Sequence, residues 1–419
     1  MKKSGLLGGG LGFTIGKEQK KDRYDEDDTI QKGSVIGSAK GDVRITAKDD
    51  IRAEASVISA GKNAVIEGKN VTITSKDNVY HSKESHEYKK SGLSVSLGGG
   101  AVDVLGEAAG QVHRGSQVRD NTVKALYGYE GYNTVKEGLA DYKNNPASMK
   151  PVVQVGFGSS HYQDTSSIHA AEAVGSQVTA GETISIHSKE DLTVKGSSVA
   201  GKDVTLEAGK NISLISSANT TVSQTNTSGK SSGAGISLSA SSTGIYANAF
   251  AHKGKEQEET ISHTESVVSA KNHLAMKSGK DTFIHGGKAE SKKVTVQAGG
   301  NLSIESETDS DSYTETAGTK GGSIQLGGSY TVQAGKTNTD SRYKSVTDQS
   351  GIYAGSEGYD ANVKGNTDLK GAVIDSQAPA EKNHLTTGTL TWDDIGNKAG
   401  YEAGGLWHRL QQRRKYQAQ

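Results

Sequence analysis

The sequence predicts a mainly β protein, a β-solenoid of about 20 residues per coil with glycine-rich hairpin excursions and one helical insertion. Short runs that alternate apolar and polar residues recur at a fixed step of twenty, from Ile184 to Val204 and from Leu192 to Ile212. Glycine accounts for 54 of 419 residues and hydrophobic residues for 32%, which suits a narrow core better than a thick globular one.

The repeat returns in the other two blocks of the chain. It separates Leu274 and Val294, Ile284 and Ile304, Ile51 and Val71, and, with a slip to twenty-one, Val43 and Ala64. Twenty extended residues at about 3.3 Å each make a loop of at most roughly 66 Å, which is enough for a small three-sided coil. Each strand would then bond its copy in the next coil, with Val204 and Ile212 inward and Thr205 outward.

Gly-Lys-Asp and Gly-Lys-Asn triplets stand between the strand pieces, as at 201–203 and 209–211. Glycine tolerates a positive φ, and Asp or Asn can bond its own backbone in a turn. The doubled phrase in residues 201–217 therefore predicts two faces of one coil.

A glycine-rich alternating hairpin follows each coil block, at 92–100, 233–250 and 321–335, and residues 151–160 suit the return strand of the first. Apolar residues share one side of these strands: Leu93, Val95 and Leu97; Val153, Val155 and Phe157; Ile236 and Leu238. This pattern also suits a strand of a membrane barrel, but the apolar stretches are short of the roughly ten residues of a span. We expect each hairpin to fold back over the solenoid or to lengthen its sheet.

The first module contains additional residues. Ala64 and Val204 are 140 apart whereas Val204 and Val294 are 90 apart, and the excess falls in 102–150, where Val123, Leu126 and Tyr127 have helical spacing. The predicted domains are a repeat module with its hairpin at 1–100, a helical insertion at 101–150, two further modules at 151–350, and terminal coils with a basic tail at 351–419. Residues 10–29 are expected to be a return strand without its outgoing partner, so that the chain opens inside a module.

Charge and cysteine content exclude several classes of function. The 48 basic and 48 acidic residues balance, so no global basic field attracts nucleic acid. The absence of cysteine excludes disulfides, thiol catalysis and Cys-ligated zinc. The sequence contains no run of 18 apolar residues, and its start does not fit a signal peptide, so export would depend on a segment outside this sequence.

The chemical motifs favour structural interpretations. GKSS at 229–232 resembles a phosphate-binding loop, but Gln224 replaces the first glycine that the motif requires, and a polar hairpin loop is expected. The acidic run at 22–28 lacks the spacing of calcium loops and predicts a solvated loop. Five histidines lack metal-ligand spacing and are expected on the surface: His81, His86, His161, His169 and His187.

Two further sets of residues have competing interpretations. Asp203, Glu207 and Glu190 are the candidate acids of a carbohydrate-active β-helix enzyme, yet they occupy different turn and strand positions. Three or more carboxylates on one solenoid face would favour that enzyme. The basic tail could touch phosphate groups or form a charged helical cap over the last coil: Arg409, Arg413, Arg414 and Lys415.

Several segments resemble the distal haemagglutinin-repeat region of filamentous-haemagglutinin-type proteins, which include two-partner-secretion adhesins and the exported proteins of contact-dependent growth inhibition. The segments are residues 2–28, 201–217, 351–376 and 386–405, and the pattern GxxAGxxGxDxxVxGNTDLKGAVI at 351–374 is the most specific. The resemblance covers nearly the whole chain. The family's N-terminal secretion domain, its Val-Glu-Asn-Asn motif and its toxin domain have no counterpart in the sequence.

The resemblance implies a right-handed parallel β-helix that forms a structural and adhesive stalk segment. Its implied partners are an outer-membrane transporter, for export of the full-length protein, and the outer membrane or a surface receptor of another cell. It implies an extracellular, cell-surface location and delivery of a downstream toxin. We expect no catalysis, no cofactor, no metal, no nucleic acid and no small-molecule substrate for this segment.

Overall fold

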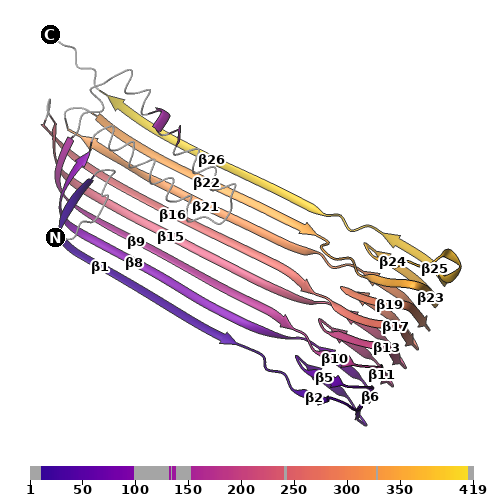
Figure 1. Ribbon diagram of the computed structural model, residues 1–419. Helices are drawn as coiled ribbons and strands as arrows, with labels where there is room; N and C mark the ends of the chain where they lie inside the picture. Colours follow the sequence, from indigo (N-terminus) through magenta and orange to yellow (C-terminus); the bar gives the residue numbers. More distant parts are fainter. Residues whose placement is uncertain are drawn as a thin grey trace.

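The computed structural model describes residues 11–98, 132–133, 135–137, 152–239, 243–326 and 329–413. They form one sheet of 18 strands with parallel pairing and one antiparallel sheet of 8 strands. The short parallel strands stack at one end, and the long strands run side by side to the other end (Figure 1).

The parallel strands form a β-solenoid, as predicted. They are β2 (Val35–Ser38), β3 (Val43–Thr46), β4 (Ile51–Glu54), β5 (Val57–Ala60), β6 (Ala64–Gly68), β7 (Val71–Thr74), β10 (Gln177–Ala180), β11 (Thr183–Ser188), β12 (Leu192–Lys195), β13 (Ser198–Ala208), β14 (Ile212–Ile215), β17 (Ser266–Ser278), β18 (Thr282–His285), β19 (Gly287–Ala298), β20 (Leu302–Glu305), β23 (Gly351–Lys370), β24 (Val373–Ser376) and β25 (His384–Asp393). A short 3₁₀ helix, η2 (Ala380–Lys382), precedes β25.

The strand register confirms the twenty-residue coil. Ile184 pairs with Val204, and Leu192 pairs with Ile212. One coil consists of β10, β11 and β12, and each of these strands pairs with its counterpart in the following coil. The predicted slip of twenty-one also holds, since Val43 pairs with Ala64.

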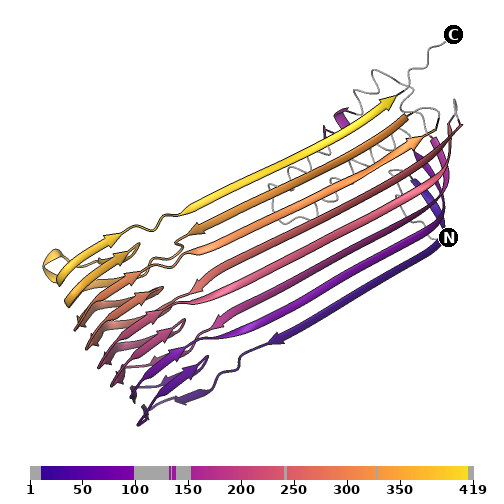
Figure 2. The same ribbon diagram turned by 180° about the vertical axis from the view of Figure 1, so that it is seen from behind.

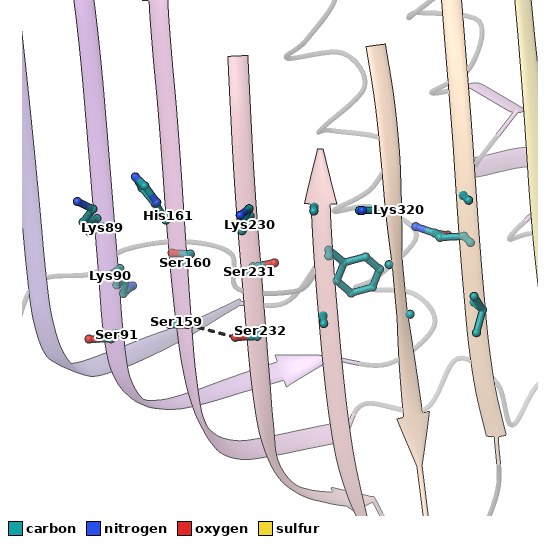
Figure 3. Close-up of a pocket in the computed structure, with 18 of the residues that line it drawn as sticks. Lys89, Lys90, Ser91, Ser159, Ser160, His161, Lys230, Ser231, Ser232 and Lys320 are labelled. Atoms are coloured by element: carbon teal, nitrogen blue, oxygen red, sulfur yellow. Dashed lines mark hydrogen bonds between the residues drawn. The ribbon is translucent and has the colours of Figure 1, made fainter. Parts of the chain in front are cut away.

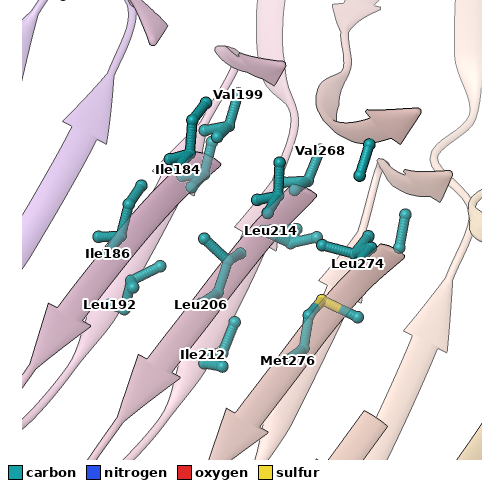
Figure 4. Packing of buried hydrophobic residues seen from close by; sticks show 14 of the residues in the cluster. Ile184, Ile186, Leu192, Val199, Leu206, Ile212, Leu214, Val268, Leu274 and Met276 are labelled. Atoms are coloured by element: carbon teal, nitrogen blue, oxygen red, sulfur yellow. The ribbon is translucent and has the colours of Figure 1, made fainter. Parts of the chain in front are cut away.

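The solenoid contains the hydrophobic core (Figure 4). Ile184, Ile212 and Leu214 are fully buried, and Val204 is 1% exposed. Thr205 is exposed, as its position in the alternation predicts. Because Leu274 and Met276 continue the same stack in the next block, the core is a narrow column of aliphatic side chains rather than a wide globular interior.

A ladder of alternating Asp and Asn side chains follows one corner of the solenoid. The Asn70 amide donates to Asp50 (2.8 Å), and the Asn211 amide donates to Asp191 (2.9 Å). Backbone N–H groups of successive coils donate to the same set, at Asp191, Asp281, Asn301 and Asn366. The ladder explains the triplets that end at Asn70, Asn211 and Asp281, because each of these side chains bonds a neighbouring coil.

The long strands form a separate antiparallel sheet. In spatial order they are β1 (Leu11–Thr29), β8 (Lys76–Gly98), β9 (Val152–Val174), β15 (Ser217–Ser239), β16 (Thr243–Thr264), β21 (Asp309–Gln325), β22 (Ser329–Ser345) and β26 (Lys398–Arg413). Two coils lie between successive hairpins, and the coils before and after a hairpin pair directly, as β5 does with β10.

The expectation that the hairpins fold back over the solenoid or lengthen its sheet is wrong. The hairpin strands pair only with one another and extend away from the solenoid (Figures 1 and 2). They are also longer than predicted, since β8 contains 23 residues and begins at Lys76 rather than near Gly92. Its first part has polar residues on both faces, and backbone pairing with β9 keeps it extended.

Buried serines fix the point at which each return strand enters the solenoid. Ser176, Ser266 and Ser350 follow β9, β16 and β22, and each is at most 1% exposed. Ser176 Oγ donates to the Thr74 carbonyl (2.8 Å), and Ser266 Oγ lies 2.9 Å from the Val194 carbonyl. These bonds satisfy buried backbone groups at the junction.

An ion pair supports the junction of the last two hairpins. Lys288 Nζ lies 2.7 Å from Glu265 and 3.1 Å from Asp348, which follow β16 and β22. Burial opposes the charge of Lys288, but its bonds to both carboxylates outweigh burial and raise its pKa. The lysine therefore stays charged and joins two hairpin bases to β19.

The predicted helical insertion at 101–150 lies outside the described residues except for 132–133 and 135–137, which are helical. For the basic tail, the alternative of a helical cap is wrong at Arg409 and Arg413, which lie in a strand. Arg409 lies in β26, opposite Gln333, and Arg413 ends the strand opposite Ser329. Arg414 and Lys415 lie outside the described residues.

Candidate docking surface of the antiparallel sheet

The two faces of the antiparallel sheet differ in exposure. Register aligns side chains into rows that cross the strands, and successive rows point to opposite faces. Lys89, His161 and Lys230 are exposed, whereas Lys90, one position along β8, is only 7% exposed. We call the face with Lys89 the outer face and the face with Lys90 the covered face.

Glycines with aromatic residues beside them shape the covered face. His252 lies across from Gly229, where an added Cβ atom would be 2.0 Å from the imidazole Cε1. Trp407 lies in the same way over Gly335, at 2.4 Å. Since neither site has room for a side chain, glycine at these positions lets the aromatic rings lie against the neighbouring strand.

A hollow of about 980 Å³ crosses the middle of the sheet. Its lining comes from seven neighbouring strands of the antiparallel sheet, β1, β8, β9, β15, β16, β21 and β22. Lys90, Ser160, Ser231 and Phe250 form one row of the covered face, and outer-face residues such as Lys89, Lys230 and Lys320 also line the hollow. Figure 3 shows how the side chains of neighbouring strands lie around it.

An apolar band occupies the outer face at the end of the sheet far from the solenoid. Its residues are between 39% and 64% exposed: Ile15, Leu93, Val153, Phe157, Ile236, Leu238, Ile245, Ile324, Leu326, Val332 and Leu410. Within one row, Ile15 pairs with Leu93 and Leu93 with Phe157, so the band continues from strand to strand. A contiguous exposed patch of this kind indicates an interaction surface.

A cationic belt adjoins the band on the same face. Its residues occupy the next three outer-face rows toward the solenoid: Lys89, Lys230 and Lys320; Lys21, Lys253 and Lys336; Arg23 and Lys255. All of them are exposed. Glu87 is the one acid in these rows, and it binds Lys89 (2.6 Å) and His161 (3.0 Å). Hydrogen bonding to Lys89 is the main cause of its lowered pKa.

Acids on the covered face have different surroundings. Burial raises the pKa of Glu315, and the nearby Glu256 raises it further. The Tyr313 hydroxyl donates to Glu256 (3.0 Å) and lies 3.3 Å from Glu315. Glu256, Tyr313 and Glu315 therefore form a hydrogen-bonded cluster within the sheet.

The motifs singled out in the sequence do not come together in a site. GKSS at 229–232 lies inside β15, so the expected hairpin loop is wrong. The acidic run at 22–28 lies in β1, paired with β8, so the expected loop is wrong there too. Backbone pairing along full strands overrides the local polarity that suggested loops.

The histidines are spread over both sheets. His86 binds Asp22 (2.9 Å), a contact that raises the histidine pKa, and His187 binds Glu207 (3.2 Å). The rings of His81 and His169 are 5.9 Å apart. Among the described residues, no group of three or more His, Cys, Asp or Glu side chains has the geometry to hold a metal ion.

The candidate acids of the solenoid belong to separate interactions. Glu207 binds Lys277 (2.6 Å), which lowers the pKa of the carboxylate, whereas Glu190 binds Lys210 (3.2 Å). Asp203 pairs through its backbone with Thr183 and His273. These contacts divide the three acids among different partners.

The comparisons with known proteins identify the repeat. The family model described as "Hemagglutinin repeat" matches residues 14–126 and 155–320. This is more than half of the chain. The chain belongs to the hemagglutinin repeat family. The repeat agrees with the parallel coils and hairpins of the structure, and with the resemblance carried by the sequence motifs.

Three relatives match 96% of the chain. They are the tRNA nuclease CdiA of Yersinia mollaretii (33% identical), the deoxyribonuclease CdiA of Dickeya dadantii (32%) and the toxin CdiA of Escherichia coli (32%). The chain spans only 13–14% of the length of these relatives. No solved structure matches the chain. No helix among the described residues is both long enough and apolar enough to cross a membrane.

Proposed function

We propose that this chain is a stalk and docking segment of a longer, toxin-delivering filamentous-haemagglutinin-like protein. The observation that carries the proposal is the match of 96% of the chain to proteins named as toxins and nucleases. The solenoid provides a rigid rod, because each coil bonds to its neighbours over all three faces. The antiparallel sheet provides an exposed surface beside that rod.

The proposal places the chain outside the cell that makes it. An outer-membrane transporter exports the full-length protein, and the sheet then engages the outer membrane or a surface receptor of another cell. The exposed apolar band supports this role, since a patch that crosses the sheet is a site for a partner.

The chain itself carries no catalytic activity in this proposal. The nuclease names belong to relatives of which the chain spans a small part. The alternative, a carbohydrate-active β-helix enzyme, needs carboxylates gathered on one solenoid face. The separate ion pairs of Glu207 and Glu190 support the stalk over that enzyme.

A segment exchange tests the proposal. In the E. coli toxin CdiA, the segment that aligns with this chain is replaced by residues 1–419. Surface display is measured with antibody on intact cells, and delivery is measured as loss of viable target cells in co-culture. We expect the exchanged protein to be displayed and to inhibit target cells, whereas a matched deletion of the segment is displayed without inhibition. Display without inhibition by the exchanged protein would contradict the delivery role.

A further inference from the structure

The outer face combines two adjoining features, the apolar band and the cationic belt. The apolar band covers the outermost rows, and the cationic belt begins in the row of Lys89, Lys230 and Lys320. Among the described residues, Lys21, Lys230, Lys253, Lys320 and Lys336 have no ion-pair partner within 4.0 Å. The belt therefore offers several uncompensated positive charges in parallel rows.

Small residues separate the two features along β9, β15 and β21. Along the outer face of β15, toward the solenoid, the order of side chains is Leu238, Ile236, Ala234, Ser232 and then Lys230. The change from apolar to basic side chains also occurs in two other strands of the sheet, where Phe157 precedes His161 in β9 and Ile324 precedes Lys320 in β21. Such a layered face matches a layered partner, apolar on one side and anionic on the other.

A bilayer surface with anionic lipids has this layering. Apolar side chains enter the boundary between headgroups and acyl chains, while Lys and Arg lie at the level of the phosphates. A nucleic acid would match the belt but would offer nothing to the apolar band. An acidic protein could match both only by placing its own apolar patch beside its acids.

We propose that the outer face of the sheet binds anionic phospholipid at a membrane surface, with the apolar band among the acyl chains and the cationic belt on the lipid phosphates. The inference deepens the proposed function and rests on it, because it names the chemistry of the surface that the sheet engages. It predicts selectivity for anionic over zwitterionic lipid, which an apolar band alone would not provide.

The test uses the full chain, residues 1–419, with vesicles of phosphatidylcholine and with vesicles of phosphatidylcholine and phosphatidylglycerol. The belt variant carries Lys89→Gln, Lys230→Gln and Lys320→Gln. Its control carries Lys189→Gln, Lys202→Gln and Lys271→Gln, which remove the same charge from exposed solenoid positions. We expect the belt variant to lose on the order of 100-fold in partitioning to anionic vesicles, and the control to lose little.

A second variant separates the two features. Phe157→Ser, Ile236→Ser and Ile324→Ser remove apolar surface from the band without removing charge. We expect weaker binding to both kinds of vesicle, with selectivity for anionic lipid retained. Circular dichroism checks that every variant keeps its β structure. Free inorganic phosphate at constant ionic strength should not displace the chain, since it lacks the acyl layer.

Three results would overturn the inference: equal partitioning of the belt variant and the parent chain, equal loss in the solenoid control, or displacement by free phosphate. Selective binding to an acidic protein with no vesicle binding would also overturn it. If vesicles are not bound but the exchanged toxin still inhibits target cells, the inference fails and the proposed function stands. If vesicles are bound selectively but inhibition is lost, the proposed delivery role fails.

Discussion

The solenoid and the antiparallel sheet use strands in different ways. Of the described residues, every member of the hydrophobic core cluster lies between Val43 and Val363 in or beside the solenoid strands, and none lies in the antiparallel sheet. The sheet instead exposes large apolar side chains, such as Ile236 at 49% and Phe157 at 64%. One region keeps its apolar residues for stability, and the other keeps them accessible to a partner.

This difference follows from connectivity. In the solenoid, three strands of one coil enclose a space, so inward residues of all three faces meet. The hairpin strands form one open sheet that encloses no core. They are stabilised mainly by backbone hydrogen bonds and cross-strand side-chain pairs. A large stability difference between equal substitutions in the two regions is therefore expected.

The largest expected effect comes from a matched pair of Ile→Ala substitutions. Ile212 is fully buried in the solenoid, whereas Ile236 is half exposed on the sheet. Ile212→Ala should lower the free energy of unfolding by about 2–5 kcal/mol, because it leaves a cavity in a narrow core. Ile236→Ala should cost less than about 1 kcal/mol, because the side chain is already hydrated. Chemical denaturation followed by circular dichroism measures both.

Equal losses of unfolding free energy at Ile212 and Ile236 would contradict the view that the solenoid core provides most of the stability and that the sheet leaves its apolar residues exposed. A larger loss at Ile236 would mean that the sheet buries its outer face in solution. Thr205→Ala serves as the exposed control within the solenoid.

The solenoid could be predicted in detail because its period is local. Each coil must place an aliphatic residue against its copy, so the step from Ile184 to Val204 appears directly in the sequence. Asp191 and Asn211, which belong to the corner ladder, are also twenty residues apart. Their spacing is visible in the sequence, but the hydrogen bond between their side chains is seen only in the structure.

Residues 10–29 were expected to be a strand and form β1, whereas the other strands of the sheet could be predicted only at their far end. There the outer face alternates with glycine and serine, and the pattern marks strands such as 233–239. Nearer the solenoid, Asp22 and Lys230 belong to strands whose residues are polar on both faces, so periodicity gives no signal and loops were expected. The cationic belt was missed for a related reason. Its members come from strands far apart in sequence, and only the register of the whole sheet brings them together.

An intermediate effect is expected from the corner ladder. Asn211 donates to Asp191 and accepts from the backbone N–H of Asp281 (3.2 Å), so its side chain connects three coils. Asn211→Ala should cost about 1–3 kcal/mol, because it removes one of the two hydrogen bonds from residue 211 to Asp191 and takes the side-chain acceptor from the Asp281 N–H. Asn226→Ala, at an exposed position of the sheet, is the matched control. Comparable melting temperatures for the two variants would show that the ladder contributes no stability.

The smallest expected effect concerns the acids on the covered face of the sheet. Burial raises the pKa of Glu315 in the folded protein above its ordinary value of 4.5. The folded state therefore holds more protons than the unfolded state between these two pKa values. Stability falls as pH rises through that window and levels off above it. Glu315→Gln removes the titrating group but keeps a side-chain oxygen as an acceptor for Tyr313.

We expect Glu315→Gln to raise stability at neutral pH by about 1 kcal/mol or less, and to flatten its dependence on pH above about 4.5. Glu259→Gln, at an exposed position of β16, should change neither. Thermal melts across the acidic range compare the parent chain with both variants. Because the cluster lies in the sheet and not in the solenoid, the change should affect the sheet transition where the two regions melt separately. A Glu315→Gln variant that melts lower at neutral pH would show that the charged carboxylate is favourable in its place, against the effect of burial.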